Sequence, residues 1–297
     1  MPPLKIFITG GSGLLGQYLN RELAKHAEIL SLYNSHIGNT SNFGGVKVDI
    51  RNTEELISIF DSFRPGITIH LAAVSNPVIR GAEYDKQVYD INVRATENIA
   101  RMCDKYNSRL IYTSTDLVYA GYRGSMLKED AKLIPVSLYA ETKLMGEQKI
   151  IETFENYIIL RTALLIGFGL NHSSSHFDSL YNNLKSGRES KLFTDQFRTP
   201  LSLQEAARII SELAVKDISG QIVNFGGLTR VSRFDVGEIL CRLLKCSPAL
   251  LIPAKMSDLP NYPAVADVSM DTSKLKDFGI FQKQLEVSIS EIIAERE

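Results

Sequence analysis

The chain has 297 residues with a formal net charge of -1, and 44% of its residues are hydrophobic. This near-neutral balance excludes the strongly basic surface typical of nucleic-acid-binding proteins, so we expect no nucleic-acid partner. No apolar run approaches the ~20 residues that a transmembrane helix needs, and we expect no membrane partner either. The length suits one large α/β domain, or one such domain with a smaller appendage.

The three cysteines, Cys103, Cys241 and Cys246, are odd in number and lack the spacing of a metal site. We therefore expect reduced thiols in a cytoplasmic protein, and no bound metal. His172 and His176 lie four residues apart, but no third ligand is evident, so zinc is not expected there. The first four residues lead directly into an apolar strand, which gives no indication of a signal peptide.

A glycine-rich stretch, 9–16, follows the apolar run 5–8 and precedes leucines at helical spacing. A strand, a glycine turn and a helix in that order form a phosphate-binding unit, because the helix presents free N–H groups and its positive dipole end. The spacing G-x-x-G-x-x-G alone also occurs in plain turns, but this context favours dinucleotide binding. The expected cofactor contacts are Gly10, Ser12, Gly13, Leu14, Leu15 and Gly16.

The second predicted strand, 28–33, ends beside the expected position of the adenosine ribose. An acidic residue there would bind the 2′-hydroxyl of NAD, whereas an Arg would hold the 2′-phosphate of NADP. The sequence has neither and offers Asn34, Ser35 and His36, so it favours NADP slightly and leaves NAD possible. These side chains are cofactor contacts or, equally, an exposed polar loop.

A third strand is predicted over 46–50, where Asp49 and Ile50 would meet the adenine, although a turn Asp is as good an explanation. The apolar run 67–73 reads as a buried parallel strand. His70 within it is interpreted as a hydrogen-bonded core residue. The small residues after it would let a cofactor lie against the backbone. The remaining expected cofactor contacts are Leu71, Ala72, Ala73, Asn92, Thr113 and Thr162.

Strand 109–113 ends in the polar cluster Ser114-Thr115-Asp116, at the edge where open α/β sheets bind ligands. Tyr139 and Lys143 follow, four residues apart on one helix face, with Ser137 as a plausible N-cap. A neighbouring ammonium is expected to lower the pKa of the phenol, which could then exchange a proton with a substrate oxygen. Thr115 could hold that same oxygen by a hydrogen bond.

The Y-x-x-x-K spacing occurs a second time, at Tyr181 and Lys185, so the spacing alone decides nothing. Tyr139 follows the fifth strand and its hydroxyl cluster, whereas Tyr181 follows the sixth strand, 158–162, without such a partner. We therefore interpret Tyr181 as part of an ordinary amphipathic helix.

The later part of the chain alternates helices and strands less regularly. A strand is predicted over 222–225, and the stretch 248–263 is interpreted as too proline-rich for regular structure. The strand order as a whole predicts an α/β fold, a Rossmann-type doubly wound parallel sheet with right-handed crossovers. The predicted helices are 54–63, 81–106 (as one or two), 177–187, 203–215, 234–244 and 285–294.

With these motifs in place, the chain resembles the extended short-chain dehydrogenase/reductases, and within them the dTDP-4-dehydrorhamnose reductase group. The resemblance implies a Rossmann domain over 1–165, to which 200–230 returns, and a small C-terminal α/β substrate-binding part over 166–297. It implies the catalytic residues Thr115, Tyr139 and Lys143. It leaves a homodimer open. The segments that carry it are 114–119, 139–147, 160–162, Asp195-Gln196 with Pro200, and 267–275.

The resemblance also implies NADP as cofactor and a nucleotide sugar as substrate. Arg198 departs from the group, which usually has Gly in this Asp-Gln-x-Gly-x-Pro turn, and this puts the particular sugar in doubt. The expected substrate contacts are Val74, Thr115, Asp116, Asn171, Asp195, Gln196 and Arg198.

Three functions remain at this stage. The first is reduction of a 4-keto group on a deoxy-sugar nucleotide, with Tyr139 as the proton donor. The second is an epimerase or dehydratase of the same fold with a tightly held NAD, which the missing acidic residue after the second strand disfavours. The third is a cofactor-binding regulatory subunit that acts through a partner.

Overall fold

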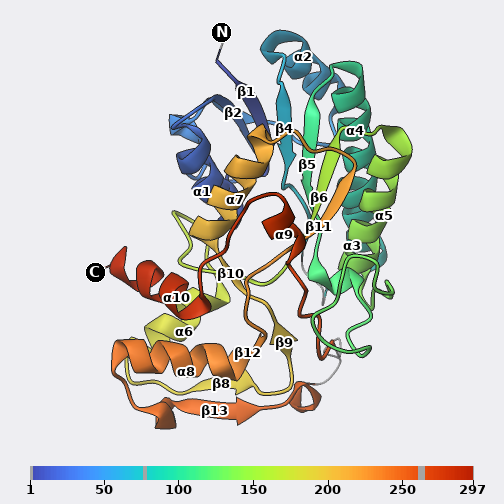
Figure 1. Ribbon diagram of the computed structural model, residues 1–297. Helices are drawn as coiled ribbons and strands as arrows, with labels where there is room; N and C mark the ends of the chain where they lie inside the picture. Colours follow the sequence, from blue (N-terminus) through green and yellow to red (C-terminus); the bar gives the residue numbers. More distant parts are fainter. Residues whose placement is uncertain (1–2, 76–78, 260–264, 297) are drawn as a thin grey trace.

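The computed structural model describes residues 3–75, 79–259 and 265–296, and its centre is a seven-stranded parallel sheet (Figure 1). The sheet order is β11-β6-β5-β4-β1-β2-β3, the order of a doubly wound Rossmann fold. The predicted fold class is thus confirmed. The strands are β1 (Lys5–Thr9), β2 (Glu28–Tyr33), β3 (Gly45–Lys47), β4 (Ile67–His70), β5 (Arg109–Thr113), β6 (Tyr157–Thr162) and β11 (Gln221–Phe225).

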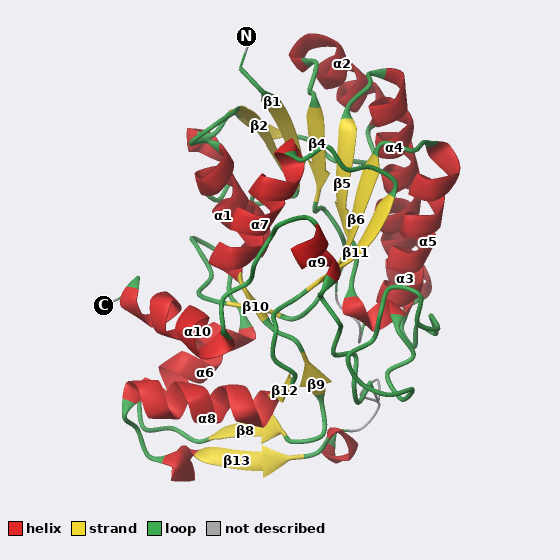
Figure 2. Ribbon diagram, in the orientation of Figure 1, coloured by secondary structure: helices red, strands yellow, loops and turns green. Residues whose placement is uncertain are grey.

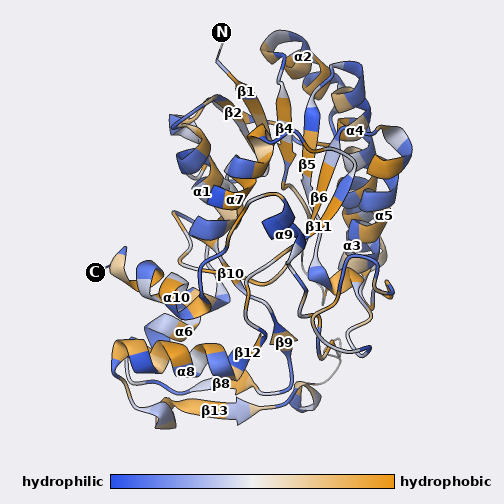
Figure 3. Ribbon diagram, in the orientation of Figure 1, coloured by the Kyte–Doolittle hydropathy of each residue, from blue (hydrophilic) through white to orange (hydrophobic). Residues whose placement is uncertain are grey.

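Helices cover both faces of this sheet because its strands are apolar on both sides. In β1, Ile6 and Ile8 pack toward α1 (Leu14–Leu23) and α7 (Leu203–Val215). Phe7 points the other way, toward α2 (Thr53–Phe63), α4 (Thr96–Lys105) and α5 (Leu138–Thr153). Figure 3 shows these central strands as mainly hydrophobic, which is the pattern expected of a buried parallel sheet.

The predicted helical region 81–106 is divided into three parts. Helix α3 (Ala82–Tyr89) leads into a π-helical segment, Asp90–Ala95, and then into α4. The predicted mid-helix Asn92 lies in this π segment, and such segments often occur at functional sites. Strands β3 and β4 are shorter than predicted, because 48–50 and 71–73 leave the ladder at the edge of the sheet where the cavities lie.

The C-terminal elements form a separate apolar cluster below the sheet in Figure 2. Three two-stranded sheets join β10 with β7, β12 with β9, and β13 with β8. The chain returns to the main sheet between these elements, because β11 follows β10 in the sequence and pairs with β6. The strands are β7 (Leu165–Ile166), β8 (Ser190–Phe193), β9 (Phe197–Arg198), β10 (Leu201–Ser202), β12 (Val231–Ser232) and β13 (Leu251–Ala254); the helices are α6 (His176–Lys185), α8 (Arg233–Leu244) and α10 (Leu285–Ala294). The short helix α9 (Lys274–Asp277) packs instead on β11, with Leu275 in the core of the main sheet.

The proline-rich stretch 248–263 contains regular structure, and the prediction against it was wrong. Strand β13 includes Pro253 and pairs in parallel with β8, with Pro253 opposite Leu192. This sheet has two strands, so β13 is an edge strand, where the missing N–H of proline is tolerated. Pro260 and Pro263 lie outside the described residues. Short 3₁₀ helices span Thr40–Asn42, Asp116–Val118, Pro248–Leu250 and Met256–Asp258.

Among the described residues, no helix is both long enough and apolar enough to cross a membrane. The domain boundaries at 165 and 166 stay predictions.

Candidate active site

The glycine loop between β1 and α1 is shaped by close backbone contacts. Gly10 has φ of +69°, and a Cβ added there would lie 2.7 Å from the backbone nitrogen of Ala72. A Cβ on Gly16 would collide with the backbone of Gly10 and Gly11. Gly13 caps the N-terminus of α1, and a Cβ there meets only the Gly10 carbonyl, at 3.1 Å. The helix start therefore faces open space, as a phosphate cradle requires.

Two cavities meet at this loop, since Gly10, Gly13, Leu71 and Ala73 line both. The larger, of about 500 Å³, lies at the carboxyl ends of β5 and β6. The smaller, of about 360 Å³, lies at the end of β2. We call them the reaction cavity and the adenosine cavity. Their positions match those of the two halves of a dinucleotide site in a Rossmann fold.

Most of the sequence-predicted residues line one cavity or the other. Those on the reaction cavity include Leu14, Leu15, Gly16, Thr113, Thr115, Asp116, Tyr139, Lys143, Thr162, Gln196 and Arg198. Those on the adenosine cavity include Ser12, Asn34, Ser35, His36, Asp49, Ile50, Ala72 and Val74.

Three predicted contact residues have side chains engaged elsewhere in the protein. The Asn92 amide accepts from the Val74 backbone N–H at 2.9 Å and donates to the Val74 carbonyl at 3.0 Å. Asn171 donates to the side chain of Gln17, and the Asp195 carboxylate accepts from the Met256 N–H at 3.1 Å. These bonds hold loops around the cavities, and direct ligand contacts from Asn92, Asn171 and Asp195 stay predictions.

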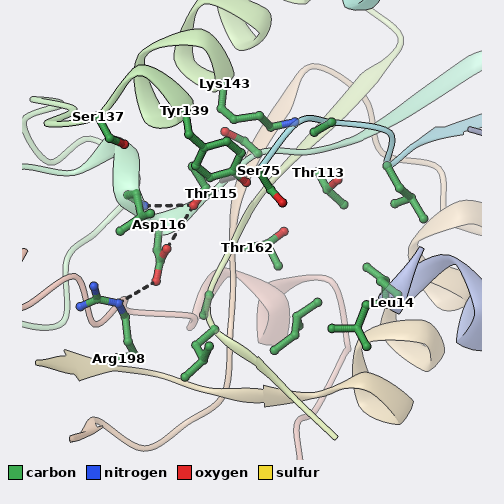
Figure 4. A pocket seen from close by; sticks show the side chains of 18 of the residues that line it. Leu14, Ser75, Thr113, Thr115, Asp116, Ser137, Tyr139, Lys143, Thr162 and Arg198 are labelled. Atoms are coloured by element: carbon green, nitrogen blue, oxygen red, sulfur yellow. Dashed lines mark hydrogen bonds and ion pairs between the residues drawn. The ribbon is translucent and has the colours of Figure 1, made fainter. Parts of the chain in front are cut away.

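Helix α5 presents Tyr139 and Lys143 to the reaction cavity, as its spacing predicts (Figure 4). The Ser137 hydroxyl accepts from the Ala140 N–H at 3.3 Å, so the predicted N-cap is confirmed. Thr115 follows β5 and caps the short helix 116–118 by accepting from the Leu117 N–H at 3.2 Å. Its hydroxyl also donates to the Asp116 Oδ1 at 3.2 Å, and like Tyr139 it lines the reaction cavity. Two hydroxyls and an ammonium thus converge in one cavity.

Burial changes the acidities of these groups. It lowers the pKa of Lys143 to about 7, although the nearby Glu147 opposes this. It raises the pKa of Tyr139 to about 12, helped by the negative charge of Asp116 and opposed by the nearby Thr115 hydroxyl. The expectation that Lys143 lowers the Tyr139 pKa is therefore corrected for this structure, because desolvation outweighs it. Tyr139 holds its proton at neutral pH.

Asp116 and Arg198 form a buried ion pair in the lining of the reaction cavity, next to Thr115. The Asp116 Oδ2 lies 3.5 Å from the Arg198 Nε, and among the described residues this oxygen has no hydrogen-bond partner. The Arg198 guanidinium also donates to the carbonyls of Phe197 and Val265. Burial raises the pKa of Asp116, with the Arg198 charge opposing it. The pair therefore presents an unsatisfied carboxylate oxygen beside Thr115.

A second buried ion pair lies behind the site and fixes α5 to the sheet. Glu147 accepts from the Arg161 Nη2 at 2.9 Å and from the Ser114 hydroxyl at 2.5 Å. Arg161 also donates to the Tyr119 hydroxyl at 3.1 Å and to the Glu129 carbonyl at 2.8 Å. Each charged group has several partners, which is the arrangement that a buried charge requires.

Gly146 lets α5 approach β5 closely. A Cβ added there would lie 2.5 Å from the Tyr112 hydroxyl and 3.0 Å from the Asn92 carbonyl. Below it, the Lys143 ammonium lies 4.0 Å from the centre of the Tyr112 ring. The contacts of Gly146 and Lys143 with Tyr112 therefore set the distance between α5 and β5.

Sequence reasoning missed several residues of the site. Ser75, His176 and Arg233 also line the reaction cavity, and His172 lines the adenosine cavity. Arg233 opens α8 directly after the Ser232 N-cap, and its side chain donates to Gln196 at 3.3 Å. The capping signal at Ser232 could have placed this arginine at a helix start, but not in the cavity.

Comparison with known proteins places the chain in a family. Residues 4–297 match the family described as "RmlD substrate binding domain". The chain belongs to this family. A dTDP-4-dehydrorhamnose reductase from Aggregatibacter actinomycetemcomitans is 28% identical over 75% of this chain and 71% of the relative. The methionine adenosyltransferase 2 subunit beta of Xenopus laevis is 24% identical over 95% of this chain and 85% of that protein.

Solved structures of similar fold cover nearly the whole chain. The dTDP-4-dehydrorhamnose reductase from Bacillus anthracis, in complex with NADP, superposes with a TM-score of 0.86 at 21% identity, covering 99% of both chains. The Bordetella bronchiseptica enzyme WbmG, in complex with NAD, gives 0.84 at 22% identity, over 98% of this chain and 93% of the other. At these identities the likeness establishes the fold.

Proposed function

We propose that this chain catalyses the NAD(P)H-dependent reduction of the 4-keto group of a 4-keto-6-deoxy nucleotide sugar, of the dTDP-4-dehydrorhamnose type. The observation that carries the proposal is that Thr115, Tyr139 and Lys143 line the same cavity as the glycine loop. The family membership and the reductase among the relatives support the substrate class.

The chain fits a nicotinamide dinucleotide on its own geometry. The start of α1 faces open space, and the backbone at Ala72 and Ala73 lines the adenosine cavity beside it. The end of β2 carries no carboxylate that would repel a 2′-phosphate. The NADP complex of the similar Bacillus anthracis protein supports NADP, and the NAD complex of WbmG keeps NAD possible.

Tyr139, Thr115 and Lys143 each have a separate role in the proposed reaction. Bound NADPH supplies the hydride that reduces the substrate carbonyl carbon. Tyr139 protonates the alkoxide that forms, and its raised pKa keeps the phenol protonated at neutral pH for this step. The Thr115 hydroxyl orients the carbonyl oxygen. Lys143 holds the ribose next to the nicotinamide by hydrogen bonds from its buried side-chain nitrogen to the ribose hydroxyls.

Asp116 and Arg198 are proposed to select the sugar. The Asp116 Oδ2 can accept a hydrogen bond from a sugar hydroxyl, because it is buried at the cavity and no residue in the described part of the chain donates a hydrogen bond to it. Gln196, whose side chain is held by Arg233, supplies further polar contacts. This arrangement suits a small polyhydroxylated substrate.

Replacing Tyr139 with Phe tests the proposal. Removal of the proton donor should lower kcat by the ~10²–10⁴-fold typical of a general acid, with NADPH affinity unchanged. The measurement is the loss of reduced-nicotinamide absorbance on addition of a dTDP-4-keto-6-deoxy sugar. The chain offers a matched control in Tyr181→Phe, because Tyr181 has the same Y-x-x-x-K spacing but lies in the C-terminal apolar cluster. Full turnover by Tyr139→Phe would refute the assignment.

A second candidate is a cofactor-binding subunit, favoured by the similarity to methionine adenosyltransferase 2 subunit beta. The same assay separates the two functions. A binding subunit would bind NADPH with no turnover of keto sugars by the wild type, and would associate stably with an enzyme. Turnover that depends on Tyr139 but not on Tyr181 would exclude it.

A further inference from the structure

Two histidines from distant parts of the chain meet at the edge of the adenosine cavity. His36 follows β2, and His172 lies in the loop between β7 and α6. Their rings stack with centroids 4.5 Å apart and an interplanar angle of 30°. Both side chains line the cavity and both residues are exposed, so a ligand can reach them.

One buried amide fixes both loops. Gln17 of α1 donates from its side chain to the Leu170 carbonyl at 2.8 Å and to the Ser173 hydroxyl at 2.9 Å. Its side-chain oxygen accepts from the Asn171 side chain at 2.5 Å and from the Asn39 backbone N–H at 3.2 Å. The two loops that carry the histidines are therefore tied to the same helix, directly after the glycine loop.

The charges around the histidines favour an anion. The titratable residues among the described lining of the adenosine cavity are Tyr33, His36, Asp49 and His172. The Asp49 carboxylate is paired with Arg51, whose Nε lies 3.0 Å from it, and this reduces its repulsion of an anion. The two imidazoles are the groups of this lining that can take up a positive charge near neutral pH.

We propose that His36 and His172 together bind the 2′-phosphate of NADP. The inference rests on the proposed function, because it assumes that the adenosine cavity holds this cofactor. The end of β2 is where a Rossmann fold places the ribose 2′-oxygen, and His36 lies there. An Arg usually takes this role, and two histidines replace it here. NAD lacks the phosphate, so the pair is the determinant of NADP preference.

Binding should be coupled to protons. Partial burial and the facing His36 lower the pKa of His172, so the two rings oppose each other's charge. A phosphate dianion beside them favours the charged imidazoles and reverses this effect. NADP binding should therefore take up protons near neutral pH, whereas NAD binding should not. The preference for NADP should rise as the pH falls from 8 toward 6.5, and level off where the phosphate itself is protonated, near pH 6.

Calorimetric titration of the full chain with NADP⁺ and NAD⁺ tests this inference. At pH 6.5 we expect the ratio of NADP⁺ to NAD⁺ affinity to be about tenfold higher than at pH 8. Titrations in two buffers of different ionisation enthalpy should show proton uptake with NADP⁺ that exceeds the uptake with NAD⁺. The double variant His36→Gln/His172→Gln should lose about tenfold in this ratio at pH 6.5, together with its pH dependence and the extra proton uptake.

His26→Gln is the matched control, because His26 is exposed in the turn after the far end of α1. It should leave both the affinity ratio and the proton uptake unchanged. A double variant that keeps the wild-type ratio or its pH dependence would overturn the inference and leave the proposed function intact. Equal loss of NADP⁺ and NAD⁺ affinity would also overturn it, since the histidines would then serve the adenosine as a whole. If the wild type bound neither cofactor, the proposed function would fail as well.

Discussion

The two buried ion pairs, Glu147 with Arg161 and Asp116 with Arg198, differ in how completely their charged groups are hydrogen-bonded. Glu147 and Arg161, behind the site, are bonded to each other and to Ser114, Tyr119 and Glu129. In the pair of Asp116 and Arg198, which lines the cavity, one carboxylate oxygen receives no hydrogen bond from the part of the chain that the structure describes. A buried charge is expensive unless it is fully paired. The saturated pair thus serves the scaffold, and the unsaturated pair has capacity left for a ligand.

The largest effect that this comparison predicts is on stability. Glu147→Gln leaves the Arg161 guanidinium buried without a counter-charge, which should cost about 3–5 kcal/mol of unfolding free energy. Chemical denaturation measures it. The matched control is Glu97→Gln, because Glu97 pairs with Arg101 on the exposed side of α4 at 2.8 Å and should lose no more than about 0.5 kcal/mol. An equal loss of unfolding free energy in the two variants would show that the buried Glu147–Arg161 pair stabilises the fold no more than an exposed pair does.

A smaller effect is predicted on catalysis at the second pair. Asp116→Asn keeps the shape of the side chain but loses the charged acceptor, so kcat/KM for the keto sugar should fall roughly 10–100-fold. NADPH affinity should stay at the wild-type value, because Asp116 is proposed to contact the sugar and not the cofactor. Steady-state kinetics and cofactor titration give the two quantities. Unchanged kinetics would mean that the open oxygen of Asp116 has no ligand.

The smallest predicted effect is on the pH dependence of stability. The raised pKa of Asp116 means that the folded state favours the protonated carboxyl. This contribution is fully present below the unfolded pKa of ~3.9 and is lost as the pH rises through the folded pKa. Between about pH 4 and 7, Asp116→Asn should therefore lose less stability than the wild type.

Denaturation curves at several pH values check this difference, with the exposed Asp130→Asn as the control. Parallel curves for the wild type and Asp116→Asn would show that Asp116 titrates alike in the folded and unfolded states.

The parts of the site that follow from local sequence were predictable. The Ser137 cap, the spacing of Tyr139 and Lys143 and the glycine loop each depend on residues a few positions apart. The strand at Gln221–Phe225 was also predictable, from its apolar pattern. Strand β13 was not, because its pairing with β8 joins segments about sixty residues apart and overrides the proline in it.

The electrostatics of the site depend on burial, which a sequence does not show. The spacing of Tyr139 and Lys143 suggests a lowered phenol pKa, whereas the folded protein raises it. The pairing of Asp116 with Arg198 joins β9 to the end of β5, and no local pattern connects them. The stacking of His36 on His172 was equally unpredictable, because the two residues are far apart in the sequence and each one lies in an ordinary polar loop.

The space between α5 and β5 at Gly146 is too small for even one additional methyl group. Any side chain at this position would wedge α5 away from β5, against the Tyr112 hydroxyl and the Asn92 carbonyl. Tyr139 and Lys143 are on the same helix, so a displacement of α5 would move both side chains out of the cavity together. Gly146 lies on the same face of α5 as Tyr139 and Lys143, so its missing side chain sets how closely these two reactive groups approach the cavity.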